Sequence, residues 1–140
     1  MTTTASYDRV KWHECVVELL SRSDAIADRD DDGRAVYYLF GWAGSVQFTD
    51  SRGQLTTVEA CLGSVRMDGF SLLTKAELPA DQIVIAEIEC ADGIERRIFA
   101  KIESAESAAR HGKTFECSVI DRPEDIGENA IRLRMKQDFN

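Results

Sequence analysis

Apolar residues near the amino terminus repeat with the period of an α-helix. The repeat places Trp12, Cys15, Val16 and Leu19 at positions i, i+3, i+4 and i+7. Side chains with this spacing share one side of a helix, so the pattern predicts a helix from about Tyr7 to Arg22. We expect its apolar side to be buried, against the rest of the chain or against a second subunit. Residues 24–32 are polar and run through three consecutive aspartates to Gly33, which predicts a turn or linker.

From residue 35 the pattern changes to short runs rich in aromatic and β-branched residues, which is typical of strands. The expected strands are Ala35–Thr49, Leu55–Leu62, Phe70–Thr74, two strands within Ile83–Ile102, and Thr114–Ile120. A parallel α/β sheet needs a helix between successive strands, and the intervals between these runs are too short to hold one. The sequence therefore predicts an all-β domain, an antiparallel barrel or sandwich, with flanking helices.

The segment Ile83–Ile102 is the clearest hairpin, and its apolar faces fix the pairing of the two strands. A two-residue turn would pair Val84 with Lys101 and would mix the two faces of the hairpin. A three-residue loop, residues 91–93, pairs Val84 with Ala100 and keeps the apolar side chains together. Because register follows the hydrophobic face, we expect the three-residue loop.

The carboxy-terminal segment fits two interpretations. Ile131, Leu133 and Met135 alternate with basic residues, as they would in a strand. However, residues 121–124, Asp-Arg-Pro-Glu, have the composition of a helix start, and residues 130–137 are good helix formers. We expect a carboxy-terminal helix, with a strand as the alternative for residues 130–136.

Charge and hydropathy exclude several classes of protein. The chain carries 25 acidic and 17 basic side chains, a formal net charge of -8, and a surface this negative repels a phosphate backbone. No apolar run approaches the roughly 20 residues that span a bilayer, and the amino terminus lacks the pattern of a secretory signal. We therefore expect a cytoplasmic protein that contacts neither DNA nor membranes, with its cysteines reduced.

Residues suited to catalysis or metal binding do not form a recognisable motif. The four cysteines are Cys15, Cys61, Cys90 and Cys117, too far apart for the paired ligands of a zinc site. The sequence has no Gly-x-Ser-x-Gly elbow and no glycine-rich phosphate loop, and His111 lies in a predicted exposed turn. We expect a protein without a cofactor or metal that is not an enzyme.

Arginines near turns are the remaining candidates for binding. Arg29 and Arg34 flank the acidic segment, and Arg66 lies in the turn before Gly69. A guanidinium suits two-pronged recognition of a phosphate or of a guanine edge. Two interpretations remain open: a nucleotide site beside two tyrosines, or surface ion pairs with nearby aspartates.

The order of these features resembles a PilZ domain. The resemblance rests on the arginine-led entry, the aromatic strand, the loop ending at Gly69, and three runs: Phe70-Ser-Leu-Leu-Thr, Leu78-Pro-Ala-Asp-Gln-Ile-Val-Ile and Phe115-Glu-Cys-Ser-Val-Ile. It covers residues 29–120, and the tail occupies the place of the family's terminal helix. Residues 1–28, expected to hold the amino-terminal helix and a linker, lie outside the resemblance. Residues 29–140 would then form a six-stranded antiparallel PilZ-like β-barrel with a terminal helix.

PilZ domains are bacterial signalling modules that commonly bind cyclic di-GMP through Arg-x-x-x-Arg and Asp/Asn-x-Ser-x-x-Gly segments. Carried onto this sequence, the resemblance assigns ligand contacts to Arg29, Arg34, Ser64, Arg66 and Gly69. The spacing of the first two and the identities of Ser64 and Arg66 depart from the family pattern. We expect a degenerate domain that acts through protein–protein interaction, with a dimer possible through the amino-terminal helix. The alternative is a cyclic di-GMP sensor with a rearranged site.

Overall fold

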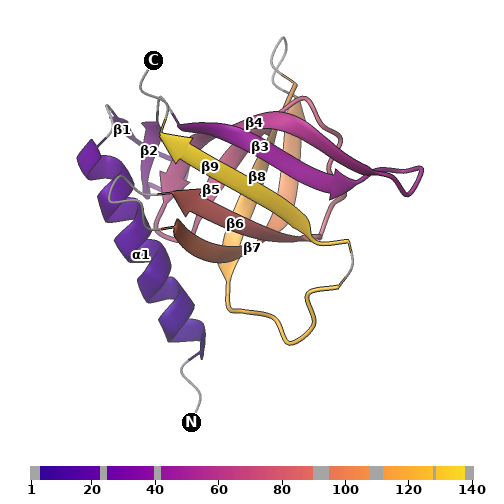
Figure 1. Cartoon of the computed structure of the whole chain (residues 1–140). Coiled ribbons are helices and arrows are strands. Elements are labelled where there is room, and N and C mark those ends of the chain that lie inside the picture. The colour runs from indigo at the N-terminus through magenta and orange to yellow at the C-terminus, as the bar shows by residue number, and fades with distance from the viewer. Residues whose placement is uncertain are drawn as a thin grey trace.

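A computed structural model describes residues 4–22, 25–39, 42–89, 95–107, 112–127 and 129–137. These residues form one helix and nine strands (Figure 1). The elements are α1 (Thr4–Arg22), β1 (Ala25–Arg29), β2 (Ala35–Leu39), β3 (Trp42–Thr49), β4 (Leu55–Arg66), β5 (Gly69–Thr74), β6 (Ile83–Glu89), β7 (Glu95–Ser107), β8 (Lys113–Ile120) and β9 (Ile131–Gln137).

Seven of the strands close into a barrel in the order β4-β3-β9-β6-β7-β8-β5, and pairing of β4 with β5 completes the ring. All neighbours in this ring are antiparallel except β6 and β9, which run parallel. The predicted all-β class and the barrel are confirmed. The predicted six-stranded, fully antiparallel arrangement is wrong, because the carboxy-terminal segment enters the wall as an additional strand.

The predicted carboxy-terminal helix is wrong, since residues 131–137 form β9. Ile131, Leu133 and Met135 are at most 2% exposed, which places them in the barrel core. Each backbone edge of β9 pairs with a neighbour, β3 on one side and β6 on the other. This pairing and the burial of alternate side chains outweigh the intrinsic helix propensity of the segment. The described residues between β8 and β9 form neither helix nor strand, so no helix begins at Asp121.

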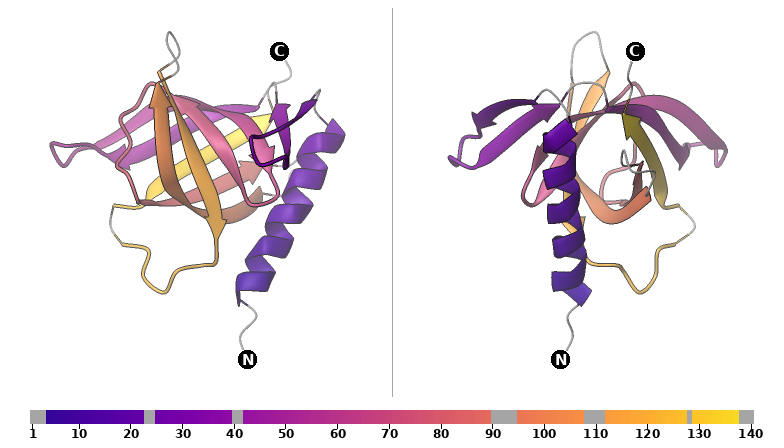
Figure 2. Two further views of the ribbon diagram at one scale, coloured as in Figure 1. Left: turned by 180° about the vertical axis from the view of Figure 1, so that it is seen from behind. Right: turned by 60° about the vertical axis from the view of Figure 1, so that its left-hand side comes forward.

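The segment 24–32, predicted to be a polar linker, instead contains strand β1. β1 pairs antiparallel with β2, and the expected domain boundary at residue 28 falls inside it. The turn between them confirms the predicted turn: the Asp30 carboxylate accepts hydrogen bonds from the backbone N–H groups of Asp32 and Arg34, both at 2.9 Å. β2 pairs with Ser64 and Val65 near the end of β4, whereas β3 pairs with residues 55–61 of that strand. The β1–β2 hairpin therefore extends from the barrel wall (Figure 2, right view).

The predicted register of the β6–β7 hairpin is confirmed. Val84 lies opposite Ala100, and Glu87 lies opposite Arg97 on the other face. The loop at 91–93 lies outside the described residues.

Helix α1 runs past one end of the barrel and places its apolar side on the core (Figures 1 and 2). The four residues of its stripe are all at most 4% exposed. The Trp12 indole N–H donates a hydrogen bond of 2.9 Å to the Arg66 carbonyl, and its ring packs against Phe70 at 5.5 Å. Arg96 of β7 adds an ion pair of 3.2 Å with Glu18. The apolar stripe that raised the possibility of a second subunit is thus buried by its own chain.

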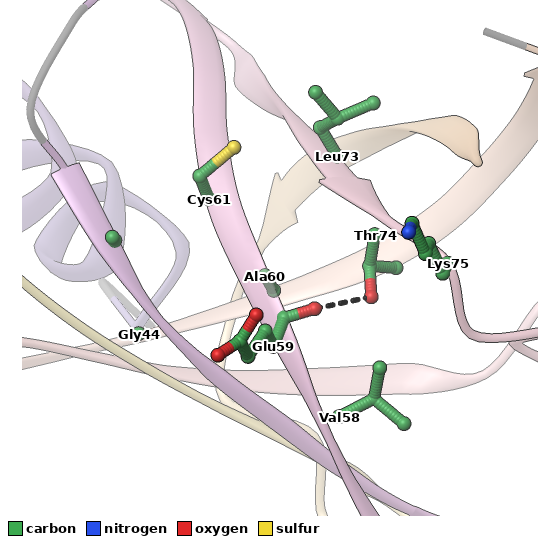
Figure 3. Close-up of a pocket in the computed structure, with 9 residues that line it drawn as sticks. Gly44, Val58, Glu59, Ala60, Cys61, Leu73, Thr74 and Lys75 are labelled. Atoms are coloured by element: carbon green, nitrogen blue, oxygen red, sulfur yellow. Dashed lines mark hydrogen bonds between the residues drawn. The ribbon is translucent and has the colours of Figure 1, made fainter. Parts of the chain in front are cut away.

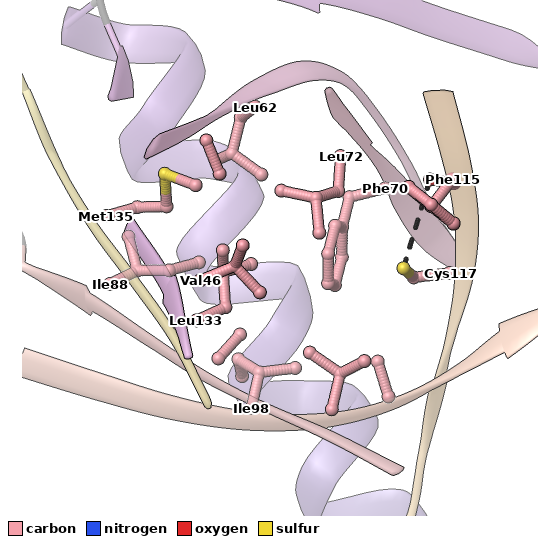
Figure 4. Packing of buried hydrophobic residues seen from close by; sticks show 14 of the residues in the cluster. Val46, Leu62, Phe70, Leu72, Ile88, Ile98, Phe115, Cys117, Leu133 and Met135 are labelled. Carbon is pink, nitrogen blue, oxygen red and sulfur yellow. Dashed lines mark hydrogen bonds between the residues drawn. The ribbon is translucent and has the colours of Figure 1, made fainter. Parts of the chain in front are cut away.

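Side chains from every barrel strand meet in one cluster (Figure 4). Phe70, Leu72, Ile88 and Leu133 are each 0% exposed within it. The barrel interior is therefore filled by side chains, and binding chemistry must be sought on its outer surface.

Candidate functional site

Two of the predicted arginines meet at the turn between β4 and β5. Asp68 lies between them: one carboxylate oxygen is 3.3 Å from Nη1 of Arg34, and the other is 3.4 Å from Nε of Arg66. Glu116 of β8 contacts Arg66 from the other side, with Oε2 at 2.7 Å from Nη1. We call these four residues, Arg34, Arg66, Asp68 and Glu116, the arginine cluster.

The alternation of side chains along β4 explains why Arg66 faces outward. Its neighbour Val65 is 0% exposed and belongs to the core, so the next side chain along β4 points to the outer surface. Gly69 pairs with Arg66 across the turn. A Cβ at Gly69 would collide with the carbonyl oxygen of Cys117, and it would lie 3.3 Å from Nη2 of Arg66. Glycine at this position therefore allows β5 and β8 to approach each other beside the cluster.

Ser64 lies two residues before Arg66 and is 4% exposed. Its hydroxyl lies 2.7 Å from the hydroxyl of Ser71 on β5. The register of the β4–β5 pair shifts between Leu62 and Ser64, which brings these two serines opposite each other. The side chain that the PilZ resemblance assigned to ligand binding thus hydrogen-bonds within the sheet.

Arg29 lies on the β1–β2 hairpin near Arg34, but its side chain turns to a different partner. Its Nη1 donates a hydrogen bond of 2.8 Å to the carbonyl of Gly33 in the adjoining turn. It lines a hollow of about 290 Å³ together with Ala27, Asp28, Ala35 and Tyr37. The structure therefore gathers Arg34, Ser64, Arg66 and Gly69 around the β4–β5 turn and leaves Arg29 outside that group.

The charges of the arginine cluster balance within the cluster. Partial burial tends to lower the pKa of Arg66, but Glu116 and Asp68 outweigh it and raise the pKa above its ordinary value. The Arg34–Asp68 pair is largely exposed, with side chains 69% and 60% accessible, so water screens it strongly. The Arg66–Glu116 pair is shorter and its side chains are only 21% and 35% accessible. Glu116 is therefore the main competitor that an anion would meet at Arg66.

No family model, curated protein or solved structure matches the chain. Its function must be inferred from its own residues.

A second hollow, of about 560 Å³, lies between β3, β4 and the end of β5 (Figure 3). It brings Glu59, Cys61 and Lys75 together with small and apolar side chains. The Thr74 hydroxyl is occupied, since it donates a hydrogen bond of 2.7 Å to the Glu59 carbonyl. Burial raises the pKa of the Cys61 thiol, which keeps it protonated and weakly nucleophilic at neutral pH. This hollow is a surface depression without an activated nucleophile.

The other described cysteines are equally unsuited to covalent chemistry. Cys15 and Cys117 are 0% exposed. Burial, with a contribution from Glu116, raises the pKa of Cys117 to about 12. Within the ranges that the structure describes, no three His, Cys, Asp or Glu side chains are placed to hold a metal ion, and no helix is long and apolar enough to cross a membrane. His111 and Cys90 lie outside those ranges.

Sequence reasoning anticipated one acidic member of the cluster and missed the other. Asp68 is one of the nearby aspartates of the ion-pair interpretation, and its contacts with Arg34 and Arg66 are such pairs. Glu116 is 50 residues away from Arg66 along the chain, and only the pairing of β5 with β8 brings it close. The sequence carries no local sign of that contact.

Proposed function

We propose that the chain is a non-catalytic, PilZ-like signalling module of the bacterial cytoplasm that acts by binding another protein. The observation that carries the proposal is the contact of Arg66 with Glu116 at 2.7 Å, beside the bridging Asp68. This contact engages the arginine that the resemblance assigns to cyclic di-GMP. The module would then keep a barrel related to the family, while the arginine expected to bind the ligand is held in ion pairs within the protein.

Competition between carboxylate and phosphate supports the loss of the ligand. A charge-assisted hydrogen bond contributes about 1.5–3 kcal/mol, so exchanging Glu116 for a phosphate oxygen gives little net gain. The displaced Glu116 would also lie close to a dianionic ligand and repel it. The buried Ser64–Ser71 hydrogen bond removes a further polar contact. Each effect weakens cyclic di-GMP binding in the same direction.

The exposed side chains of the β1–β2 hairpin support a protein partner. Ile26 is 58% exposed and lies opposite Tyr38, which is 45% exposed. Tyrosine is enriched among the residues that contribute most at protein interfaces, and an exposed isoleucine beside it adds apolar surface that a partner can bury. They stand together on a hairpin that extends from the barrel wall, where a partner can reach them (Figure 2).

The alternative function is a cyclic di-GMP sensor with a rearranged site. It is favoured by one observation, the gathering of Arg34, Arg66 and Gly69 around a single turn. In this case the ligand would displace Asp68 and Glu116 and take both guanidinium groups.

Calorimetric titration with cyclic di-GMP at physiological salt separates the two functions. We expect no binding in the micromolar range for the unmodified chain. Glu116→Gln should bind more tightly than the unmodified chain, because Arg66 loses its competitor, whereas Glu124→Gln removes the same charge from an exposed site and should have no effect. Submicromolar binding that disappears in Arg66→Ala would overturn the proposal in favour of the sensor.

A photo-crosslinking amino acid at position 38 tests for a protein partner. We expect it to capture a discrete bacterial protein that a crosslinker at exposed Thr57 does not capture. The captured protein must then bind the purified chain, and Ile26→Ser must weaken that binding. If reconstituted binding is absent or indifferent to Ile26→Ser, the hairpin is not the interaction surface and the proposal fails.

A further inference from the structure

Strand β1 has one paired edge and one open edge. It stands at the end of the strand order, and β2 is its only neighbour among the strands that the structure describes. An open edge presents a row of backbone N–H and C=O groups that can pair with another strand. Each barrel strand, in contrast, has a neighbour on both sides along at least part of its length.

The hydrogen-bond pattern shows which groups point outward. The Asp30 N–H donates to the Arg34 carbonyl at 2.9 Å, so residues 28 and 26 also direct their backbone groups toward β2. Residues 25, 27 and 29 therefore direct theirs toward the open edge. The Arg29 N–H is already occupied, since the Asp28 carboxylate accepts it at 2.8 Å. Ala25 and Ala27 are left as the positions where a new strand can pair.

The side chains around these positions divide into an apolar part and an acidic part. Both alanines have small side chains; Ala27 is exposed, and Ala25 is half-buried against the core. Ile26 and Tyr38 lie opposite each other, exposed on one face. Asp28 follows on the same side of the strand as Ile26, and the exposed Asp31 and Asp32 continue the acidic part into the turn.

We propose that β1 is a docking edge for an extended, basic peptide segment of another protein, which adds to the sheet as a strand beside β1. This inference rests on the proposed function, and it specifies the kind of partner that the module binds. Pairing at Ala25 and Ala27 requires an extended backbone. An apolar side chain of the peptide packs beside Ile26 and Tyr38, and a lysine or arginine two residues away lies near Asp28 and the acidic turn.

Charge favours this occupant over a second copy of the chain. The formal net charge of the chain is -8, so two copies repel each other as they approach. A basic segment meets the aspartates of the acidic part with attraction. The exposed carboxylates also steer a basic segment toward the edge before the backbones pair.

A dye-labelled synthetic peptide, acetyl-Thr-Lys-Thr-Ile-Thr-Lys-Thr-amide, is the probe. Its sequence is the same in both directions, so either strand orientation places Ile beside Ile26 and a lysine near Asp28. We expect fluorescence anisotropy to detect saturable binding to the full chain. Ala27→Pro removes only an outward N–H from β1 and should weaken binding about tenfold, whereas Ala27→Ser keeps the N–H and should bind like the unmodified chain.

Two modified peptides keep the test valid even if Ala27→Pro fails to fold. One peptide is methylated at the odd-numbered backbone nitrogens and the other at the even-numbered ones, which removes hydrogen-bond donors without changing the charge. In an added strand only one of these two sets faces β1, so one of the two peptides should lose about tenfold in affinity. Replacing both lysines by glutamate should abolish binding, because the acidic part then repels the peptide. Equal affinities for all these peptides, or no saturable binding of the probe, would overturn the inference.

The outcomes distinguish this inference from the proposed function. If the protein captured at position 38 binds Ala27→Pro as well as it binds Ala27→Ser, the docking edge is wrong while the protein-binding function stands. If sedimentation shows a dimer that Ala27→Pro dissociates, the occupant is a second copy and the inference is overturned. Tight cyclic di-GMP binding would overturn the proposed function whatever the peptide does.

Discussion

Trp12 connects helix α1 to the barrel through two different contacts. Its indole N–H reaches the Arg66 carbonyl at 2.9 Å, and its ring packs against Phe70. The sequence predicted burial of Trp12 from helical spacing alone. It did not predict the hydrogen bond, because the acceptor lies 54 residues away and becomes a neighbour only when β4 reaches the end of the barrel.

Substitutions at Trp12 should separate these two contacts. Trp12→Phe loses the hydrogen bond and leaves the Arg66 carbonyl without that donor, so we expect a loss of about 1–3 kcal/mol in the free energy of unfolding. Trp12→Ala also loses the ring and should cost about 3–5 kcal/mol. Urea denaturation followed by circular dichroism measures both. Val17→Ala on the exposed side of the same helix should change stability by less than about 0.5 kcal/mol. Equal stability of Trp12→Phe and the unmodified chain would show that the hydrogen bond contributes nothing.

Glu87 is a buried carboxylate on the outer face of the sheet, 6% exposed, opposite Arg97 on β7 and Arg134 on β9. A hydrogen bond with Glu95, then the charges of Arg134 and Arg97, lower its pKa below the ordinary value of 4.5. The predicted register, with Val84 opposite Ala100, also places Glu87 opposite Arg97. The Arg134 contact depends on β9 lying beside β6, which the expected helix did not provide.

Stability should fall in acid partly because of Glu87. A carboxylate with a lowered pKa stabilises the fold above its ordinary pKa, and this contribution is lost as the pH falls through the lowered value. Glu95 acts in the opposite direction, because the same hydrogen bond raises its pKa, but it is exposed and its effect is screened. We therefore expect Glu87→Gln to show a shallower loss of unfolding free energy than the unmodified chain between about pH 5 and pH 3. An unchanged slope would exclude Glu87 as a source of the pH dependence.

Strand β9 shows how an element can be misassigned from local signals. The alternation of Ile131, Leu133 and Met135 was the correct signal, and the helix propensity of the same residues opposed it. The deciding factor is the presence of β3 and β6 on either side, which no window of sequence contains. β1 was missed for the same reason, because its polar residues form a strand only by pairing with β2.

Gly44 tests the contact between β3 and β9. A Cβ at this position would collide with the backbone carbonyl of Arg134, so Gly44→Ala must push the two strands apart. We expect a loss of about 1–3 kcal/mol or more in the free energy of unfolding, because backbone has little room to yield. Ser45→Ala, at the next position of β3, should stay within about 0.5 kcal/mol. If Gly44→Ala is as stable as Ser45→Ala, the two strands do not approach as closely as this pairing requires.

At the scale of the molecule, closure of the barrel depends on a strand from the end of the described chain. The all-β class followed from short alternating runs separated by turns, and these signals are local. The number of strands in the ring did not follow, because β9 enters between β3 and β6, which are distant in sequence. The arginine cluster shows the same division: its arginines and Asp68 were visible in the sequence, whereas Glu116 becomes a neighbour only because β5 pairs with β8.

Removal of β9 should therefore prevent the whole barrel from folding, and its effect should not be confined to the neighbouring strands. A chain ending at Ala130 would leave the edges of β3 and β6 unpaired, and it would uncover the core around Val46 and Ile88. Open edges beside exposed apolar surface favour association between chains, so we expect loss of the cooperative thermal transition and elution as large species in size-exclusion chromatography. A chain ending at Gln137 keeps β9 and is the matched control, which should unfold cooperatively. A cooperative, monomeric chain ending at Ala130 would mean that the remaining strands form a stable sheet without closure, and β9 would then be an accessory to the fold.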